Sequence, residues 1–530
     1  MKVHYIPYKK TGYFSKIITD YLEEKKEIKS FYETFPSIEN FEKQIQLKSS
    51  FSKSKRNILV SALKNQYKLL TKCDKTKRNI ELLQHENTFT ITTGHQLNLF
   101  TGPLYFLYKI ISTINLTKEL KDTYPKYNFV PIYWMATEDH DFDEINFFNF
   151  KKEVINWKTN AEGAVGRFPL ENFETVIKEF KSLLNNSNNA KKLEQLFVES
   201  YTKHKNLTDA TRFLANELFG NYGLIILDGD DADLKSLFKP QIKNELLHQN
   251  AFAEVTKTND KLEALDYNIQ VNPREINLFY LKNNSRERIL KDKGKFLINN
   301  TNQSFTKLEM LAELEKNPER FSPNVIMRPL YQETILPNLC YIGGGGELAY
   351  WLQLKSYFNA ENTVFPILLL RNSVLLISTK QLQKLNKLNV SLEEIFLPMD
   401  ELLDKKVREI SKIDIDFSPQ KDYLKQQFKD LKVLAKQTDY SFLGAVNAQE
   451  AKQLKGLEKL EKRLLKAQKR KLKDELNRIE KLKNDLFPNQ SLEERYRNFS
   501  HYYLDLGEDL LPALMANLNP LKQQFTIVEY

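Results

Sequence analysis

The sequence has only two cysteines in 530 residues, Cys73 and Cys340, and they lie far apart in the chain. Two cysteines cannot build a disulfide framework, and they are too few for a zinc site made of cysteine alone. The composition therefore excludes a small disulfide-stapled secreted protein. We interpret both residues as ordinary thiols.

Long hydrophobic runs are also missing. No segment approaches the ~20 consecutive apolar residues that span a bilayer. The start of the chain, Met1 to Pro7, has neither the apolar core nor the cleavage site of a secretory signal. We expect a cytoplasmic protein without a membrane partner. With 34 Phe and 25 Tyr, and a length beyond the roughly 250–300 residues that one core supports, at least two structural units are expected.

Excess charge is confined to one segment. The formal net charge is +10, and between Lys421 and Asp485 there are 18 Lys and Arg against 10 Asp and Glu, a net +8. The basic run Lys466–Lys471 has no interleaved aromatic residues, so it is typical of a solvated helix face and we expect no nucleic-acid partner. A relative of synthetases that handle RNA is an alternative function, which salt-dependent RNA binding would test.

Strand patterns alternate with helical patterns in the first two thirds of the chain. The predicted strands are Thr88–Thr92, Phe129–Met135, Gly223–Leu227 and Val364–Leu370. A helical pattern after Pro103 joins the first two strands, and strand–helix–strand favours a parallel sheet. We expect an α/β, Rossmann-like core over residues 1–378, with a helical first ~85 residues and a connective insertion at about 149–221.

The last third of the chain predicts long helices. From Leu454 to Leu486, leucine and isoleucine recur mostly at three- and four-residue steps, which is a coiled-coil seam. Gly444 suits a turn between two antiparallel helices, and Pro488 suits the end of the second. We expect a C-terminal helical coiled-coil domain over residues 379–530, with a final segment that returns onto the core. The coiled coil favours oligomerisation.

Ligands bind outside the carboxyl ends of strands in open parallel sheets, and four such loops have an unusual composition. The first, residues 93–103, has glycines around His95 and Gln96 and precedes a helix start that suits phosphate or carboxylate. It matches neither the dinucleotide-binding nor the Walker pattern. His95 could stabilise developing negative charge. A tight strand–helix turn is the alternative.

The second loop places Glu138, Asp139, His140 and Asp141 in succession. Such crowding shifts pKa values and suits acid–base chemistry or a divalent cation. Consecutive residues rarely hold one metal ion, so we favour binding of a substrate amine, or a general base, and assign no metal ligands. A capped helix start is the alternative. The acidic loop at residues 228–233 also reads as an ordinary turn.

The fourth loop has four glycines, Gly343–Gly346, followed by Glu347, in a chain with only 16 glycines. A glycine loop before a helix predicts a second anion cradle. Arg328 and Arg371 stand near predicted strand ends and could pair with a substrate carboxylate through two hydrogen bonds. For each arginine, a structural ion pair is an equal alternative.

Four long segments carry a family resemblance: TGHQLNLFTGPLYFLYK, PIYWMATEDHDFDEIN, SPNVIMRPLYQETILPNLCYIGGGGELAYW and ERYRNF. Their order and spacing resemble the cysteine-adding enzymes of bacillithiol biosynthesis, the BshC family, over essentially the whole chain. Two positions depart from the family pattern. His95 stands where the family commonly has glutamine, and Gly345 stands where it commonly has proline.

The resemblance implies a core similar to class I nucleotidyltransferases and a coiled coil that mediates homodimerisation. It implies a ligase that joins L-cysteine to the amine of glucosaminyl malate in the last step of bacillithiol synthesis. ATP is expected as a substrate or in its ADP form, and family members bind adenine nucleotide near the coiled coil. Mg²⁺ is compatible with ATP chemistry, although no ligands are assigned. The alternative function is a non-catalytic adaptor with a degenerate nucleotidyltransferase body that binds a thiol metabolite.

The candidate residues fall into two groups. The catalytic candidates are His95, Glu138, Asp139, His140 and Asp141. The candidates for substrate or nucleotide binding, to which the resemblance adds Lys109, Tyr496 and Asn498, are Thr93, Gly94, Gln96, Gly102, Lys109, Arg328, Gly344, Gly346, Glu347, Arg371, Tyr496 and Asn498.

Overall fold

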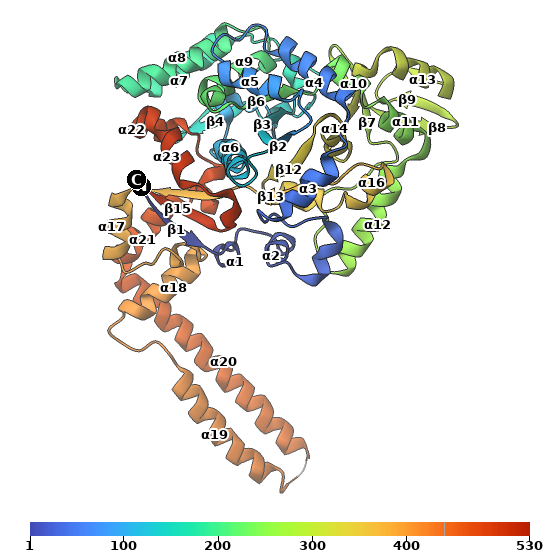
Figure 1. The fold of residues 1–530 in the computed structure, drawn as a ribbon. Helices are drawn as coiled ribbons and strands as arrows, with labels where there is room; N and C mark the ends of the chain where they lie inside the picture. Colours follow the sequence, from blue (N-terminus) through green and yellow to red (C-terminus); the bar gives the residue numbers. More distant parts are fainter. Residues whose placement is uncertain (439) are drawn as a thin grey trace. The chain divides into compact units, whose positions relative to one another are not determined.

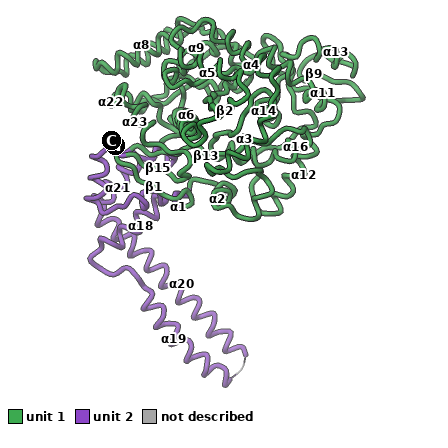
Figure 2. The backbone as a smooth tube through the Cα atoms, in the orientation of Figure 1, with its two compact units in different colours: residues 1–9, 13–376, 493–528 green, residues 10–12, 377–492, 529–530 purple. Residues whose placement is uncertain are grey.

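A computed structural model describes residues 1–438 and 440–530. The chain forms two compact units, shown in different colours in Figure 2. The first unit contains residues 1–9, 13–376 and 493–528, and the second contains residues 10–12, 377–492 and 529–530. The final segment of the chain, residues 493–528, therefore belongs to the first unit.

The first unit is built on a five-stranded parallel sheet with the order β13-β12-β2-β3-β6. Its strands are β2 (Thr88–His95), β3 (Asn128–Met135), β6 (Ile225–Asp228), β12 (Asn338–Gly343) and β13 (Ile367–Leu370). The chain starts at the central strand β2, adds β3 and β6 on one side, and then crosses to β12 and β13 on the other. This is the order of a Rossmann-like sheet, so the predicted fold class is confirmed.

The strands are buried on both faces, as parallel sheets normally are. The helix α6 (Tyr105–Thr123) joins β2 to β3 and packs on both strands, while α3 (Asn40–Lys48) packs on β12. These helices and strands are labelled in Figure 1. Phe41, Leu116, Ile91 and Ile342 belong to one buried apolar cluster between them. Burial of this cluster fixes where the carboxyl ends of the strands lie.

Further helices surround the sheet within the first unit. Before β2 they are α2 (Lys16–Leu22), α4 (Lys53–Gln66) and α5 (Asp74–Leu82), and after β6 they are α10 (Ala232–Ser236), α11 (Lys239–His248) and α12 (Asn250–Ala264). Around β12 they are α14 (Met327–Ile335), α15 (Gly345–Trp351) and α16 (Lys355–Ala360). The predicted helical start of the chain also contains one strand, β1 (Lys2–Ile6), which pairs in a small sheet of order β1-β15-β14. Its other strands are β14 (Val374–Ile377) and β15 (Phe525–Glu529).

A second, antiparallel sheet follows α12, with the order β10-β9-β8-β7-β11. Its elements are β7 (Leu278–Lys282), β8 (Ser285–Asp292), β9 (Lys295–Ile298), β10 (Ser304–Phe305) and β11 (Phe321–Pro323), with the helix α13 (Lys307–Lys316). We call this sheet the cap sheet, because residues of β7, β8 and β11 form one wall of the cavity described below.

The predicted insertion contains a two-stranded hairpin, β4 (Phe147–Phe150) and β5 (Glu153–Asn156), and three helices. The helices are α7 (Phe173–Leu183), α8 (Asn188–Thr202) and α9 (Leu207–Phe219). Phe100 from the loop after β2 packs against Phe148, Phe180 and Phe197 of this segment. Phe499, just before α22 (Ser500–Leu506) and α23 (Leu510–Asn517), completes the contact. The insertion thus anchors the first loop of the site.

The second unit consists of helices. They are α17 (Thr379–Lys387), α18 (Met399–Ile410), α19 (Ser418–Ala435), α20 (Tyr440–Lys471) and α21 (Lys473–Leu486), and α19 packs along α20. The predicted turn at Gly444 is wrong, because this residue lies within α20, which begins at Tyr440. Gly444 does not have a positive φ, and a glycine inside a long helix costs only about 1 kcal/mol. Among the described residues, no helix is long and apolar enough to cross a membrane.

Candidate functional site

A cavity of about 850 Å³ opens at the carboxyl ends of the central strands. It lies where the strand order reverses between β2 and β12, which is the position at which ligands bind in sheets of this kind. One wall comes from the ends of β2, β3 and β12, and the other comes from residues 271–279 and from β8 and β11 of the cap sheet.

His95 ends β2 and lies at the cavity with only 7% of its surface exposed. Its ring packs between Tyr105 and Phe106, at centroid distances of 5.3 and 5.2 Å. Burial, reinforced by the positive charges of Lys109 and Arg371, holds its pKa well below the usual value. The imidazole is therefore neutral, and its Nε2 has no hydrogen-bond partner in the described part of the chain.

Lys109, from the second turn of α6, connects the two loops at the strand-order reversal. Its Nζ donates to the carbonyl of Gly94 at 2.8 Å and lies 2.5 Å from the Glu347 carboxylate. Glu347 also accepts hydrogen bonds from the Gly344 N–H and from the Tyr341 hydroxyl, at 2.9 and 2.7 Å. Burial alone would raise the pKa of Glu347, but Lys109 and these donors hold it below the usual range.

Arg328 and Arg371 both line the cavity, but their guanidinium groups have different partners. Arg371 uses Nη2 for Glu494 at 2.8 Å and Nη1 for the Asn372 carbonyl, so only its Nε lacks a partner among the described residues. Arg328 donates from Nη1 to Gln332, and its Nη2 has no partner there. Each guanidinium thus keeps one free donor, but Arg371 is also held by an ion pair with Glu494, whereas no carboxylate among the described residues pairs with Arg328.

Glu138 follows β3 and is held by Lys235 of α10. The Lys235 Nζ lies 2.5 Å from Glu138 Oε1 and donates to the Phe321 carbonyl at 2.6 Å. Burial raises the pKa of Glu138; Lys235 opposes this effect and Asp230 adds to it. Glu138 lines the cavity, whereas Lys235 lies behind it.

The neighbours of Glu138 have other partners. Asp139 accepts hydrogen bonds from Gln96 Nε2 at 2.9 Å and from the His140 N–H at 2.8 Å. His140 Nδ1 lies 2.8 Å from Nη1 of Arg286. Since arginine can only donate, Nδ1 accepts. Burial and the charge of Arg286 lower the pKa of His140, which agrees with a neutral ring.

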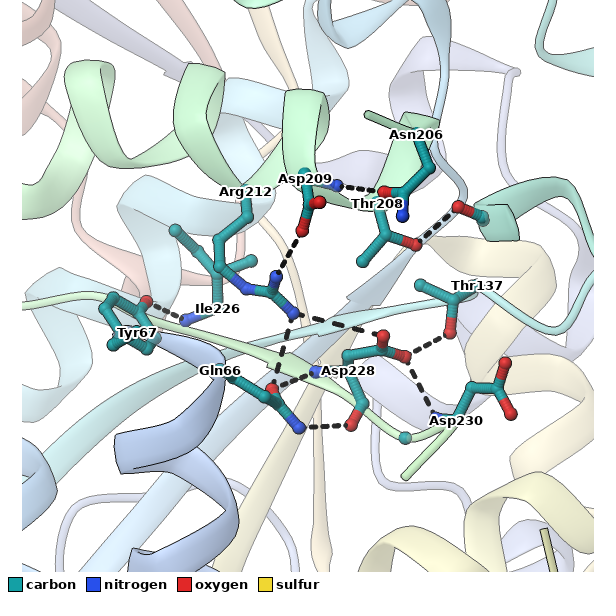
Figure 3. A network of polar contacts seen from close by, with 12 residues as sticks. Gln66, Tyr67, Thr137, Asn206, Thr208, Asp209, Arg212, Ile226, Asp228 and Asp230 are labelled. Carbon is teal, nitrogen blue, oxygen red and sulfur yellow. Dashed lines mark hydrogen bonds and ion pairs between the residues drawn. The ribbon is translucent and has the colours of Figure 1, made fainter. Parts of the chain in front are cut away.

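The acidic loop after β6 is tied to its neighbours by a network of polar contacts around Asp228 (Figure 3). Asp228 accepts hydrogen bonds from the Thr137 hydroxyl at 2.5 Å and from the Asp230 N–H at 2.9 Å, and its own N–H donates to Gln66. Asp231 caps α10, the helix that carries Lys235. The loop therefore fixes the positions of Thr137 and Lys235, on either side of Glu138.

The cavity brings together most of the residues predicted from the sequence. Those that line it are Gly94, His95, Gln96, Lys109, Glu138, Asp139, His140, Arg328, Gly344, Gly346, Glu347 and Arg371. Those outside its lining are Thr93, Gly102, Asp141, Tyr496 and Asn498.

Most of the outside residues support the first loop. The Thr93 hydroxyl donates to the Ile342 carbonyl at 2.7 Å, which ties β2 to β12. Asn498 Nδ2 donates to the carbonyls of Phe100 and Gly102 at 2.7 and 2.6 Å, and the Tyr496 carbonyl accepts from Asn149. Gly102 has a φ of +61°, a conformation that favours glycine.

Sequence reasoning missed several residues of the site. Lys235 lies behind the wall, and the missed lining residues include Tyr105, Arg274, Asn277, Arg286, Arg288, Tyr341, Tyr350 and Arg495. One signal was available, since Arg286 and Arg288 alternate along a strand and so share a face. The described residues contain no group of three or more His, Cys, Asp or Glu that could hold a metal ion.

Comparisons with known proteins agree along the whole chain. The family model described as the N-terminal Rossmann-like domain of bacillithiol biosynthesis BshC matches residues 1–372, and that of the C-terminal coiled-coil domain matches residues 374–530. A relative from Flavobacterium johnsoniae, named "Putative cysteine ligase BshC", is 58% identical over 99% of both chains. Relatives of the same name from Cytophaga hutchinsonii and Bacillus anthracis are 39% and 28% identical, over 96% and 94% of this chain and 95% of each relative.

Proposed function

The chain belongs to the BshC family of bacillithiol biosynthesis, and on that premise we propose that it joins L-cysteine to glucosaminyl malate by an amide bond, as the last step of that synthesis. Its relatives are named cysteine ligases, which makes the chain an enzyme that forms carbon–nitrogen bonds. We further propose that glucosaminyl malate is the second substrate and that the reaction requires ATP.

One observation supports it most: a free cationic donor and a largely buried carboxylate line the same cavity at the strand-order reversal. Arg328 offers Nη2 to an anion, and Glu138 offers an oxygen to an amine. A joining reaction between a carboxyl group and an amine needs both kinds of group within one enclosed space. Holding the two substrates together there supplies much of the rate.

A carboxylate is a poor electrophile, so the cysteine carboxyl must be activated, as an adenylate or as an acyl phosphate. The lining fits the anionic groups of ATP. His95 presents a neutral ring with an unpartnered Nε2, and the backbone of Gly344–Gly346 approaches without side chains. Lys109, paired with Glu347, holds these two loops together. Donors that are fixed before the reaction stabilise developing negative charge most effectively. Mg²⁺ with the nucleotide stays a prediction.

The malate carboxylates are assigned to Arg328 rather than to Arg371, because Glu494 already occupies one edge of the Arg371 guanidinium. The carboxylate of Glu138 is assigned to the attacking amine. Homodimerisation through the coiled coil, adenine nucleotide near that coiled coil and a cytoplasmic location also remain predictions.

Deletion of the gene in its host, followed by mass spectrometry of low-molecular-weight thiols, tests the function. Loss of bacillithiol with accumulation of glucosaminyl malate supports cysteine addition. The wild-type gene should restore the thiol, whereas Glu138→Gln and His95→Ala should not. Restoration by both variants would favour the non-catalytic adaptor instead.

A further inference from the structure

Lys235 is a buried lysine that no substrate in the cavity can touch. Its side chain has no exposed surface, and it is absent from the cavity lining. A buried positive charge is costly unless it is paired and hydrogen-bonded. The groups around the Lys235 ammonium must therefore compensate its charge.

Those surroundings all attract a positive charge. The Nζ atom faces Oε1 of Glu138 at 2.5 Å, the carbonyl oxygen of Phe321 at 2.6 Å and the ring of Tyr331 at 5.5 Å. A carboxylate, a carbonyl and an aromatic face are partners of an ammonium group, which has only donors. The pair is thus an ammonium and a carboxylate, with Glu138 on the cavity side.

We propose that Lys235 is a positioning residue of the amide-forming reaction, which holds Glu138 from behind as a carboxylate so that its other oxygen can accept a proton. Among the described residues, Oε2 of Glu138 accepts no hydrogen bond. The inference rests on the proposed function, because it names the general base of that same site.

The amine nitrogen attacks the activated carbonyl carbon of cysteine and forms the C–N bond. The bond from that carbon to the phosphate oxygen breaks, and the phosphate group leaves with the electron pair. The proton lost by nitrogen passes to Oε2 of Glu138.

The other acids of the loop are less suited to this role. Asp139 is already bound by Gln96 and by the backbone of His140, and Asp141 lies outside the lining. Glu138 is the acid of this loop that combines burial, a fixed position and a free oxygen. Sequence reasoning could not choose among the three.

Several charged or titratable groups face Glu138, and Lys235 is the one cation among the described residues that touches it. They are Lys235 on α10, Asp230 in the loop before it, Arg286 on β8, Arg167 and Tyr331. Arg167 is engaged by Asp230 at 2.7 Å, and Arg286 is engaged by His140 and Ser322. Without Lys235, burial and Asp230 would dominate, so the pKa of Glu138 would rise.

Infrared difference titration of the full chain measures this protonation directly. The band of a protonated carboxyl that is present in the wild type and absent from Glu138→Gln belongs to Glu138. In Lys235→Met its midpoint should rise by at least about one pH unit, and in Lys235→Arg by less. The control is Lys239→Met, which removes a partly exposed lysine paired with Glu315 and should change nothing.

The rate of amide formation against pH gives the second readout. The acidic limb of this profile should shift to higher pH in Lys235→Met and back toward the wild-type pH in Lys235→Arg. An equal loss of rate at every pH, with an unchanged infrared midpoint, would overturn the positioning role while leaving the ligase function intact. Absence of product from the wild type would instead contradict the function.

The wild type alone also tests the inference if Lys235→Met does not fold. Glu138 must be ionised at neutral pH, so its protonated-carboxyl band must have disappeared by then. A band that persists above neutral pH would overturn the proposal without any lysine variant.

Discussion

The ammonium of Lys109 and the carboxylate of Glu347 lie 2.5 Å apart and join the two loops between which the strand order reverses. Lys109 comes from the helix after β2, and Glu347 comes from the helix after β12. The same lysine binds the Gly94 carbonyl, so one side chain sets the spacing of both glycine loops. This end of the cavity is therefore held together by an ion pair within the chain.

The two cavity arginines should have different phenotypes when each is changed to glutamine. Arg328→Gln should raise the KM for glucosaminyl malate by about ten- to a hundredfold, the worth of a charged hydrogen bond. Arg371→Gln should instead lower the free energy of unfolding by about 3–5 kcal/mol, because Glu494 becomes a buried unpaired charge. Steady-state kinetics and thermal unfolding of both variants distinguish these effects, and the opposite assignment would contradict our reading of the two side chains.

Gly345→Pro should stabilise the protein by about 0.4–1 kcal/mol. Gly345 is the first residue of α15, where proline is favoured, and the preceding Gly344 has φ −77° and ψ 172°, which proline accepts in its neighbour. Gly343→Ala should instead destabilise the protein, because its Cβ would meet Leu348 at 2.9 Å. Chemical denaturation measures both. Destabilisation by proline would show that the folded loop requires a backbone conformation at residue 345 that proline cannot adopt.

The second unit should lose stability in acid through Glu394. Burial alone would raise its pKa, but Lys405, the Ser391 N–H and Lys406 lower it from 4.5 to about 2. Because the folded pKa lies below the unfolded one, the contribution is complete above about pH 4.5 and is lost as the pH falls toward 2.

The free energy of unfolding of wild type and Glu394→Gln should therefore differ by up to about 3 kcal/mol at pH 6, and the difference should shrink below pH 4.5. The exposed neighbour Glu393, paired with Lys10, gives the control variant Glu393→Gln with little effect. A difference that does not change with pH would exclude this ion pair as the cause.

The coiled coil should associate two copies of the chain. Its helix α19 exposes large apolar side chains, with 44% of Leu431 and 55% of Leu434 accessible. Apolar strips of this kind mark interaction surfaces. In sedimentation, the wild type should be a dimer and the Leu431→Glu, Leu434→Glu variant a monomer. Gln426→Glu, which adds a charge on another side of α19, should remain dimeric. A monomeric wild type would contradict the prediction.

Local sequence signals predicted the parts of the site that are local in structure. Strand β2 and its loop, the acids after β3 and the glycines before α15 are each contiguous, so composition and strand ends were enough to find them. Lys109 was predicted from the family resemblance alone, because a lysine inside a helix has no distinctive local pattern. The turn was misplaced at Gly444 because a glycine does not by itself end a helix.

The cavity wall formed by the cap sheet, and the contact of Lys235 with Glu138, could not be predicted in this way. Lys235 and Glu138 are 97 residues apart, and Arg286 and His140 are 146 apart. Such pairs depend on how the cap sheet and α10 pack on the central sheet, which periodicity does not report. The choice between Arg328 and Arg371 likewise needed the position of Glu494, near the end of the chain.

The purified protein, supplied with ATP, glucosaminyl malate and cysteine labelled with ¹⁸O in its carboxyl group, gives the most direct test of the central claim. We predict bacillithiol as product, with one ¹⁸O transferred to AMP if an adenylate forms or to phosphate if an acyl phosphate forms. Lys109→Met should abolish both products, while Lys118→Met, an exposed lysine of the same helix, should not. Binding of cysteine without any product, under conditions in which the chain restores bacillithiol in its host, would contradict the account.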